Sequence, residues 1–261
     1  MYGGNIASSS PLLQQPTTPA YPIAIRPEHI TPGETILTIR NRPEPWHALD
    51  YTIYHRNGAT LFTVHGDPWS LGHRRVFRDR SGLPLFELRG RWYNSSMLEL
   101  KLPGDTGNSD VLLSAKCRVA IQAPRVVLRF RNMVETVTTP TPTMTAAARV
   151  SHHPALAAKD NETVMEIRAL DLDNVLQVAV VEGRRVAYIE RVTDLDELME
   201  GQKPPFRFRP KWRVRVAQGV DLSLVAVMGV ILGHQVSGVG AMHVYTKAWL
   251  WRSTFIDHFI C

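Results

Sequence analysis

Cysteine is scarce in this chain of 261 residues, which contains only Cys117 and Cys261. Two cysteines cannot form a disulfide framework, and neither lies in a C-x-x-C spacing of the kind that holds zinc. The common enzyme motifs are missing as well: H-E-x-x-H, G-x-S-x-G, the P-loop and a complete dinucleotide-binding glycine pattern. We therefore predict a non-enzymatic protein with no metal and no cofactor, located in a reducing compartment. Cys117 alternates within a strand-like segment and is expected to be a small buried residue.

Long hydrophobic runs are also missing, apart from one of moderate length at residues 220–232. As a helix this run would be about 20 Å long at ~1.5 Å per residue, whereas a membrane span has to cross ~30 Å of hydrocarbon. Its residues are apolar on every side, so a soluble chain must bury it all round. Because it follows a strand-like segment at residues 211–216, we predict a helix wrapped by a sheet. Asp221 is expected to cap the start of this helix, and Gly233 to suit its end.

Short apolar runs make up most of the chain from Thr35 onward, separated by glycine, asparagine, aspartate and proline, which is typical of an all-β domain. Two hairpins are predicted, around Asn57-Gly58 and Ser81-Gly82, and Asn57-Gly58 suits a tight type I′ turn. The two hairpin sequences repeat at a constant offset of 24 residues, and a fainter copy surrounds Glu182-Gly183. Repeated hairpins of this kind build an antiparallel meander.

Three of these segments together resemble the LURP-one-related family. They are the hairpin Tyr51–Gly66, the segment Arg74–Arg91 with its Ser-Gly-Leu-Pro-Leu turn, and the sequence Gln-Gly-Val-Asp at residues 218–221 that opens the hydrophobic helix. The resemblance covers residues 36–233, and the Gly-Val-Asp with its apolar run is the most specific part. It implies the mainly β, Tubby C-terminal-like fold shared with phospholipid scramblases: a closed twelve-stranded antiparallel β-barrel around a central hydrophobic C-terminal α-helix.

The predicted domain organisation has three parts. Residues 1–30 are interpreted as a disordered N-terminal arm, and residues 31–234 as the Tubby C-terminal-like domain. Within the domain, residues 135–161 are rich in threonine, proline, alanine and histidine and are predicted to form a flexible insertion. Residues 235–261 form an atypical C-terminal tail, interpreted either as an amphipathic membrane-surface segment or as sequence foreign to the family.

Rows of basic residues alternate with apolar residues along two predicted strands. A period of two places the cations on one face of a strand and the apolar residues on the other. The candidate ligand-binding residues are those of the two rows: Arg207, Arg209, Lys211, Arg213 and Arg215 in one, and Arg125, Arg129 and Arg131 in the other. A further basic cluster comprises His73, Arg74, Arg75, Arg78 and Arg80. If several rows adjoin on the barrel, they would form an anion-binding face, because the planar guanidinium group suits phosphate.

Each row could instead be a solvated outer face that acidic residues neutralise. The segment 194–200 contains four such residues close to the first row: Asp194, Asp196, Glu197 and Glu200. Three functions therefore stay open. The first is a non-enzymatic module, cytoplasmic and peripheral at membranes, that binds phosphoinositide or other anionic headgroups. The second is nucleic-acid binding linked to transcription, and the third is a scaffold for protein partners. The formal net charge of +6 favours acidic partners and does not separate the first two.

Overall fold

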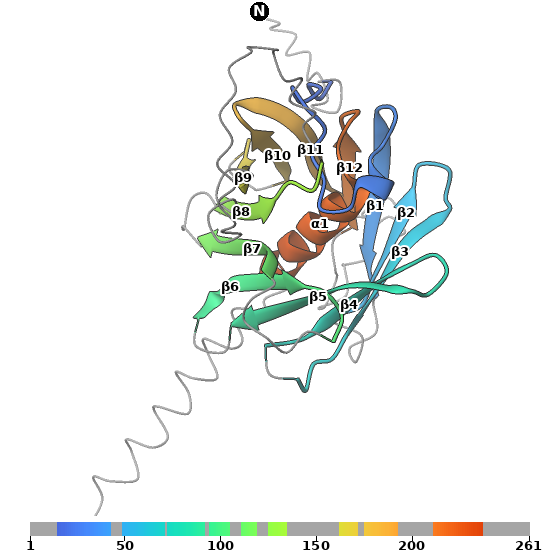
Figure 1. The fold of residues 1–261 in the computed structure, drawn as a ribbon, viewed down its shortest axis with the longest axis vertical. Coiled ribbons are helices and arrows are strands. Elements are labelled where there is room, and N and C mark those ends of the chain that lie inside the picture. The colour runs from blue at the N-terminus through green and yellow to red at the C-terminus, as the bar shows by residue number, and fades with distance from the viewer. Residues whose placement is uncertain are drawn as a thin grey trace, which may run out of the picture.

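The computed structural model describes residues 15–42, 49–70, 72–91, 94–104, 111–118, 125–134, 162–171, 175–192 and 211–236. Within these ranges, twelve strands surround a single α-helix (Figure 1). The strands are β1 (Thr35–Asn41), β2 (Tyr51–His55), β3 (Thr60–Gly66), β4 (Arg75–Asp79), β5 (Pro84–Arg91), β6 (Asn94–Lys101), β7 (Val111–Arg118), β8 (Arg125–Arg131), β9 (Glu162–Ala169), β10 (Leu176–Val181), β11 (Arg184–Val192) and β12 (Lys211–Val216). The helix is α1 (Leu222–Val236), and a short 3-10 helix, η2 (Pro27–His29), precedes β1.

The strands form a closed barrel in which each strand pairs antiparallel with its neighbours in sequence. The barrel closes where β1 pairs with β12, in a register that sets Leu37 opposite Val214. Along most strands buried and less buried residues alternate, so one face of each strand lines the interior and the other faces solvent. The predicted fold is confirmed: this is a twelve-stranded antiparallel barrel with a C-terminal helix against β1 and β12.

Helix α1 runs through the middle of the barrel (Figure 1). All its described residues from Leu224 to Leu232, except Gly229, are buried hydrophobics. It begins at Leu222, directly after the predicted cap Asp221, and continues to Val236, so the prediction that Gly233 ends the helix is wrong. Gly233 instead allows close packing, because a Cβ there would lie 2.9 Å from Cε1 of Tyr51. Among the described residues, no helix has both the length and the apolar character needed to cross a bilayer.

The sequence repeat is also a repeat of backbone structure. In the β2–β3 hairpin the Gly58 N–H donates to the His55 carbonyl, and in the β4–β5 hairpin the Gly82 N–H donates to the Asp79 carbonyl, 24 residues further on. Both glycines have positive φ, and both hairpins contain a register shift. Asn57 does not have positive φ, so the predicted type I′ turn is wrong, and the loop carries a bulge instead. Positive φ at two successive residues occurs at Glu182-Gly183.

The N-terminal segment packs against the start of α1. Ile23, Ala24 and Ile25 are buried, and Ile23 forms a parallel bridge with Val220. The structure therefore differs from the expected disordered arm of residues 1–30, because the apolar residues 23–25 cover the barrel end at which α1 begins. Residues 1–14 lie outside the described residues, as do the insertion 135–161 and the tail from residue 237.

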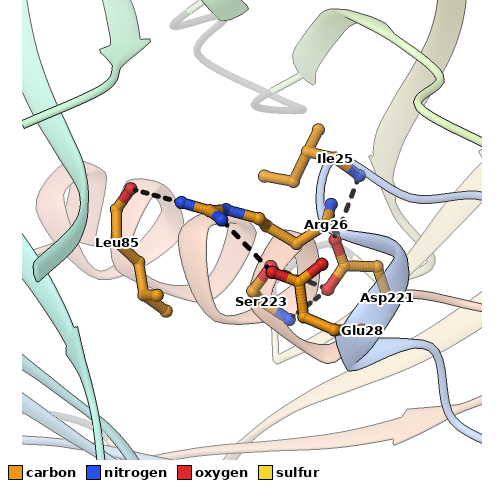
Figure 2. Close-up of polar contacts among 6 residues, drawn as sticks. All are labelled: Ile25, Arg26, Glu28, Leu85, Asp221 and Ser223. Atoms are coloured by element: carbon orange, nitrogen blue, oxygen red, sulfur yellow. Dashed lines mark hydrogen bonds and ion pairs between the residues drawn. The ribbon is translucent and has the colours of Figure 1, made fainter. Parts of the chain in front are cut away.

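The fully buried carboxylate of Asp221 joins the N-terminal segment to the helix (Figure 2). Its Oδ1 accepts hydrogen bonds from the Ser223 N–H at 2.6 Å and the Ser223 hydroxyl at 2.7 Å, which confirms the predicted cap. Its Oδ2 accepts the backbone N–H groups of Ile25 at 3.0 Å and Arg26 at 2.8 Å. Burial raises the pKa of Asp221, and the hydrogen bonds from Ser223 and the Arg26 N–H oppose this effect.

Replacing Asp221 with alanine is expected to lower the free energy of unfolding by about 3 kcal/mol, because it removes the helix cap and leaves the buried N–H of Ile25 and the partly buried N–H of Arg26 without an acceptor. Chemical denaturation followed by circular dichroism measures this loss. Asp79→Ala is the matched control: Asp79 also accepts hydrogen bonds from Ser81 N–H, Ser81 hydroxyl and Leu83 N–H, but at an exposed turn where water replaces it. Equal losses of stability in the two variants would contradict the role of Asp221 in joining the N-terminal segment to the start of α1.

Candidate anion-binding site

The outer surface of β7, β8 and β9 carries a concentration of exposed cations, which we call the basic face. It consists of Lys116, Arg118, Arg125, Arg129, Arg131 and Arg168. Each alternates with inward-facing apolar residues, so strand geometry directs all six side chains outward. The outward carboxylates of the same three strands are those of Glu162 and Glu166. Six positive charges against two negative ones leave a net charge of +4 on this surface.

Three arginines of the basic face lie in one row across three strands. Arg118 is opposite Arg125 in the β7–β8 register, and Arg125 is opposite Arg168 in the β8–β9 register. Like charges directly opposite each other destabilise a sheet. Only Glu166 relieves this row among the described residues, through ion pairs with Arg125 and Arg168.

The two carboxylates of this surface are both engaged. Hydrogen bonds from Arg168, then from Arg125, hold the pKa of Glu166 below its usual value, although burial works in the opposite direction. Glu162 forms a looser pair with Arg129, with 3.8 Å between Oε1 and Nη1. Lys116, Arg118 and Arg131 form no ion pair with a described residue. Three cations therefore remain available to an external anion.

The two predicted rows do not adjoin, because β11, β10 and β9 separate β12 from β8. The β12 cations are also less exposed than those of β8. Arg213 pairs with Glu190 on β11 at 3.4 Å, and Arg215 pairs with Glu34 at 2.5 Å. In the described part of this row, Arg213 and Arg215 are therefore each paired with an acidic residue. Arg207 and Arg209 lie outside the described residues, and so does the acidic segment 194–200.

The cluster at residues 73–80 is divided between two sides of β4. Arg74 pairs with the buried Glu87 at 2.5 Å, whereas Arg75 points into the barrel and is fully buried. Arg78 donates to the Gly82 carbonyl in its own hairpin. These residues therefore do not form one basic surface.

Sequence reasoning missed three members of the basic face: Lys116, Arg118 and Arg168. Their alternation with apolar residues was visible, since Lys116 and Arg118 flank Cys117 in the strand-like segment that contains it. What the sequence did not contain was the order and register of the strands. Cys117 itself is buried, as predicted.

A groove of about 690 Å³ adjoins the basic face over β9 and β10. Its lining includes the apolar residues Val164, Leu170, Val178 and Val180. Charged residues of the lining are three glutamates against two arginines, Glu162, Glu166, Glu182, Arg168 and Arg185, so the groove itself does not favour an anion. In the described ranges, no three His, Cys, Asp or Glu side chains come together in a way that could hold a metal ion.

A sequence model of LURP-one-related proteins matches residues 35–190, more than half of the chain. The chain belongs to the LURP-one-related family. Protein LURP-one-related 9 of Arabidopsis thaliana is 32% identical over 87 residues, which make up 31% of this chain and 42% of that protein. The chain thus matches less than half the length of this relative. An X-ray structure of another Arabidopsis thaliana protein covers 80% of this chain and 96% of its own, with 19% identity and a TM-score of 0.47. The LURP-one-related match contains all six cations of the basic face.

Glu166 in this LURP-one-related barrel is expected to titrate below the usual pKa of 4.5, because Arg168 and Arg125 stabilise its charged form. A depressed carboxyl pKa contributes stability above the usual pKa, and this contribution is lost as the pH falls through the lowered value. Carboxyl ¹³C NMR over an acid titration measures the pKa. Arg168→Gln should raise it, whereas Arg131→Gln, which removes an exposed charge without breaking an ion pair of Glu166, should change it little. An unchanged pKa in Arg168→Gln would refute this assignment.

Proposed function

We propose that this LURP-one-related chain is a non-enzymatic module that binds phosphate-bearing membrane headgroups, such as those of phosphoinositides, on the basic face. The observation that carries the proposal is the row Arg118, Arg125 and Arg168, in which one carboxylate pairs with two of the three arginines and Arg118 has no ion pair with a described residue. A bound polyanion would relieve the repulsion within this row. Guanidinium groups donate hydrogen bonds to phosphate oxygens in a fixed planar geometry, so arginine is well suited to the role.

The filled interior of the barrel supports an outer binding surface for a ligand as large as a membrane headgroup. The helix and the inward side chains of the strands form a single core cluster that runs through the barrel. A curved outer face can meet a membrane without any change in this core. Contact through exposed cations is electrostatic, and it therefore weakens as salt is added.

Vesicle co-sedimentation near physiological salt tests the proposal, with neutral vesicles compared against vesicles containing phosphatidylinositol bisphosphate. The test variant is Lys116→Gln/Arg118→Gln/Arg131→Gln, which breaks no ion pair among the described residues. We expect about a hundredfold weaker binding to the anionic vesicles, because each cation near an anionic surface contributes about fivefold to the affinity. Circular dichroism checks that the variant is folded.

The matched control is Lys211→Gln/Arg213→Gln/Arg215→Gln, which removes the same charge from β12. This variant should keep most of the binding if the basic face is the site. Equal losses in both variants would show that only net charge matters, and would overturn the proposed site. Absence of binding to either vesicle would overturn the membrane function. Binding to duplex DNA with the same variant pattern would then favour the nucleic-acid alternative, and binding to neither ligand would favour the scaffold.

A further inference from the structure

Arg75 is a cation enclosed in the apolar interior of the barrel. It begins β4 and faces inward with Phe77, and its side chain is fully buried. Its Nη2 lies 2.7 Å from Nδ1 of His234, in the last turn of α1. Arg75 therefore lies at the barrel end where α1 ends, opposite the end that Asp221 occupies.

The guanidinium group of Arg75 has no counter-charge in the described part of the chain. Its Nε and Nη1 are buried without a hydrogen-bond partner, and no described carboxylate forms an ion pair with it. Burial lowers the pKa of Arg75, and the nearby Tyr51 opposes this effect. Arginine nevertheless keeps its proton in proteins. An uncompensated buried charge is strongly destabilising, so a partner for these two nitrogens is expected.

His234 cannot supply the missing negative charge. Burial, the charge of Arg75 and the nearby His73 lower the pKa of His234 to about 3, so its ring is neutral at neutral pH. Since arginine only donates hydrogen bonds, Nδ1 of His234 must be the unprotonated acceptor. His234 therefore orients the guanidinium group of Arg75 without neutralising it.

The C-terminal end of α1 partly compensates the positive charge of Arg75. A helix dipole places roughly half a negative charge at this end, which favours a nearby cation. It leaves about half of the charge uncompensated, and it gives no acceptor to Nε or Nη1.

The loop before β4 brings a third basic side chain to this place. His73 has a φ of 50°, in the left-handed region that non-glycine residues rarely adopt. The preceding Gly72 has a φ of 80° and packs so closely on Gly90 that a Cβ would lie 2.2 Å from the Gly90 carbonyl oxygen. Strained backbone of this kind concentrates at functional sites. His73, Arg75 and His234 thus converge without a described carboxylate among them.

We infer that Arg75 is the binding residue of a small-oxyanion site inside the barrel, where its Nε and Nη1 donate to a carboxylate or phosphate oxygen while His234 holds the guanidinium group. This site is separate from the basic face, because Arg75 faces the interior and the basic face is external. Its ligand is limited to a few atoms, because Arg75 is fully buried and core side chains fill the interior. A ligand that binds only the folded state raises the melting temperature by mass action.

Thermal unfolding of the full chain tests the inference, with millimolar sodium acetate or inorganic phosphate replacing chloride at neutral pH and constant ionic strength. We expect at least one of these anions to raise the melting temperature of the wild type by about 2 °C or more. Arg75→Met should abolish the rise. Arg56→Met, which removes an exposed cation outside the basic face, should keep it and so controls for general salt effects on folded proteins. A response to phosphate alone identifies a phosphoryl ligand, and a response to acetate shows that carboxylates also fit.

A rise that persists in Arg75→Met, or no rise with either anion in the wild type, would overturn the inference. The second result would mean that the counter-charge of Arg75 comes from the chain itself. Should Arg75→Met fail to fold, the Nε–H resonance of Arg75 can be followed in wild-type protein by ¹H–¹⁵N NMR during the same titrations. This resonance should shift in a saturable way with the anion that raises the melting temperature, and an unchanged resonance would refute the site.

Discussion

The burial of a helix that has no polar face is the constraint on which the rest of this structure depends. Residues 224–232 of α1 are apolar around the whole helix, so packing on one layer of sheet would leave half of them in water. A closed barrel solves this problem, because it surrounds the helix and also leaves no unpaired strand edge. The remaining weak point is the helix start, whose free N–H groups would be buried. Asp221 satisfies one of them and at the same time binds the segment that covers this end.

Filling the barrel with its own helix limits where a ligand can bind. Gly229 shows how little room remains, because a Cβ there would lie 2.1 Å from Cδ1 of Ile39. Large ligands therefore meet the outer surface, where each strand contributes side chains at every second position. On such a surface the charge pattern is set by which strands are neighbours. Arg125 and Arg168 become adjacent because β8 pairs with β9, although 43 residues separate them in the sequence.

Local patterns predicted the features that depend on local physics. The apolar run, the Asp221 cap and the repeated hairpins each follow from a few consecutive residues, and the family resemblance added the closed barrel. Features that depend on distant partners were not predictable in this way. The pairing of Arg215 with Glu34 requires β12 to lie beside β1, and the close contact of Gly233 with Tyr51 requires the position of α1 in the barrel. Arg75 belongs with these features, because the sequence grouped it with a basic cluster and only the barrel places it facing inward with Phe77 on β4.

Two buried carboxylates of this barrel are each surrounded by hydrogen-bond donors, whereas the buried Arg75 is not surrounded by acceptors. Glu87, almost fully buried, receives hydrogen bonds from Arg74, Arg89 and the Gly104 N–H. Burial alone would raise the pKa of Glu87, but these donors outweigh it and lower the pKa. Asp221, also buried, has four donors around its two oxygens. Because hydrogen-bond donors compensate the buried charges of Glu87 and Asp221, a structural role is enough to explain these two carboxylates. Arg75 is just as deeply buried but has one neutral acceptor, so a structural role accounts for only part of its donor capacity.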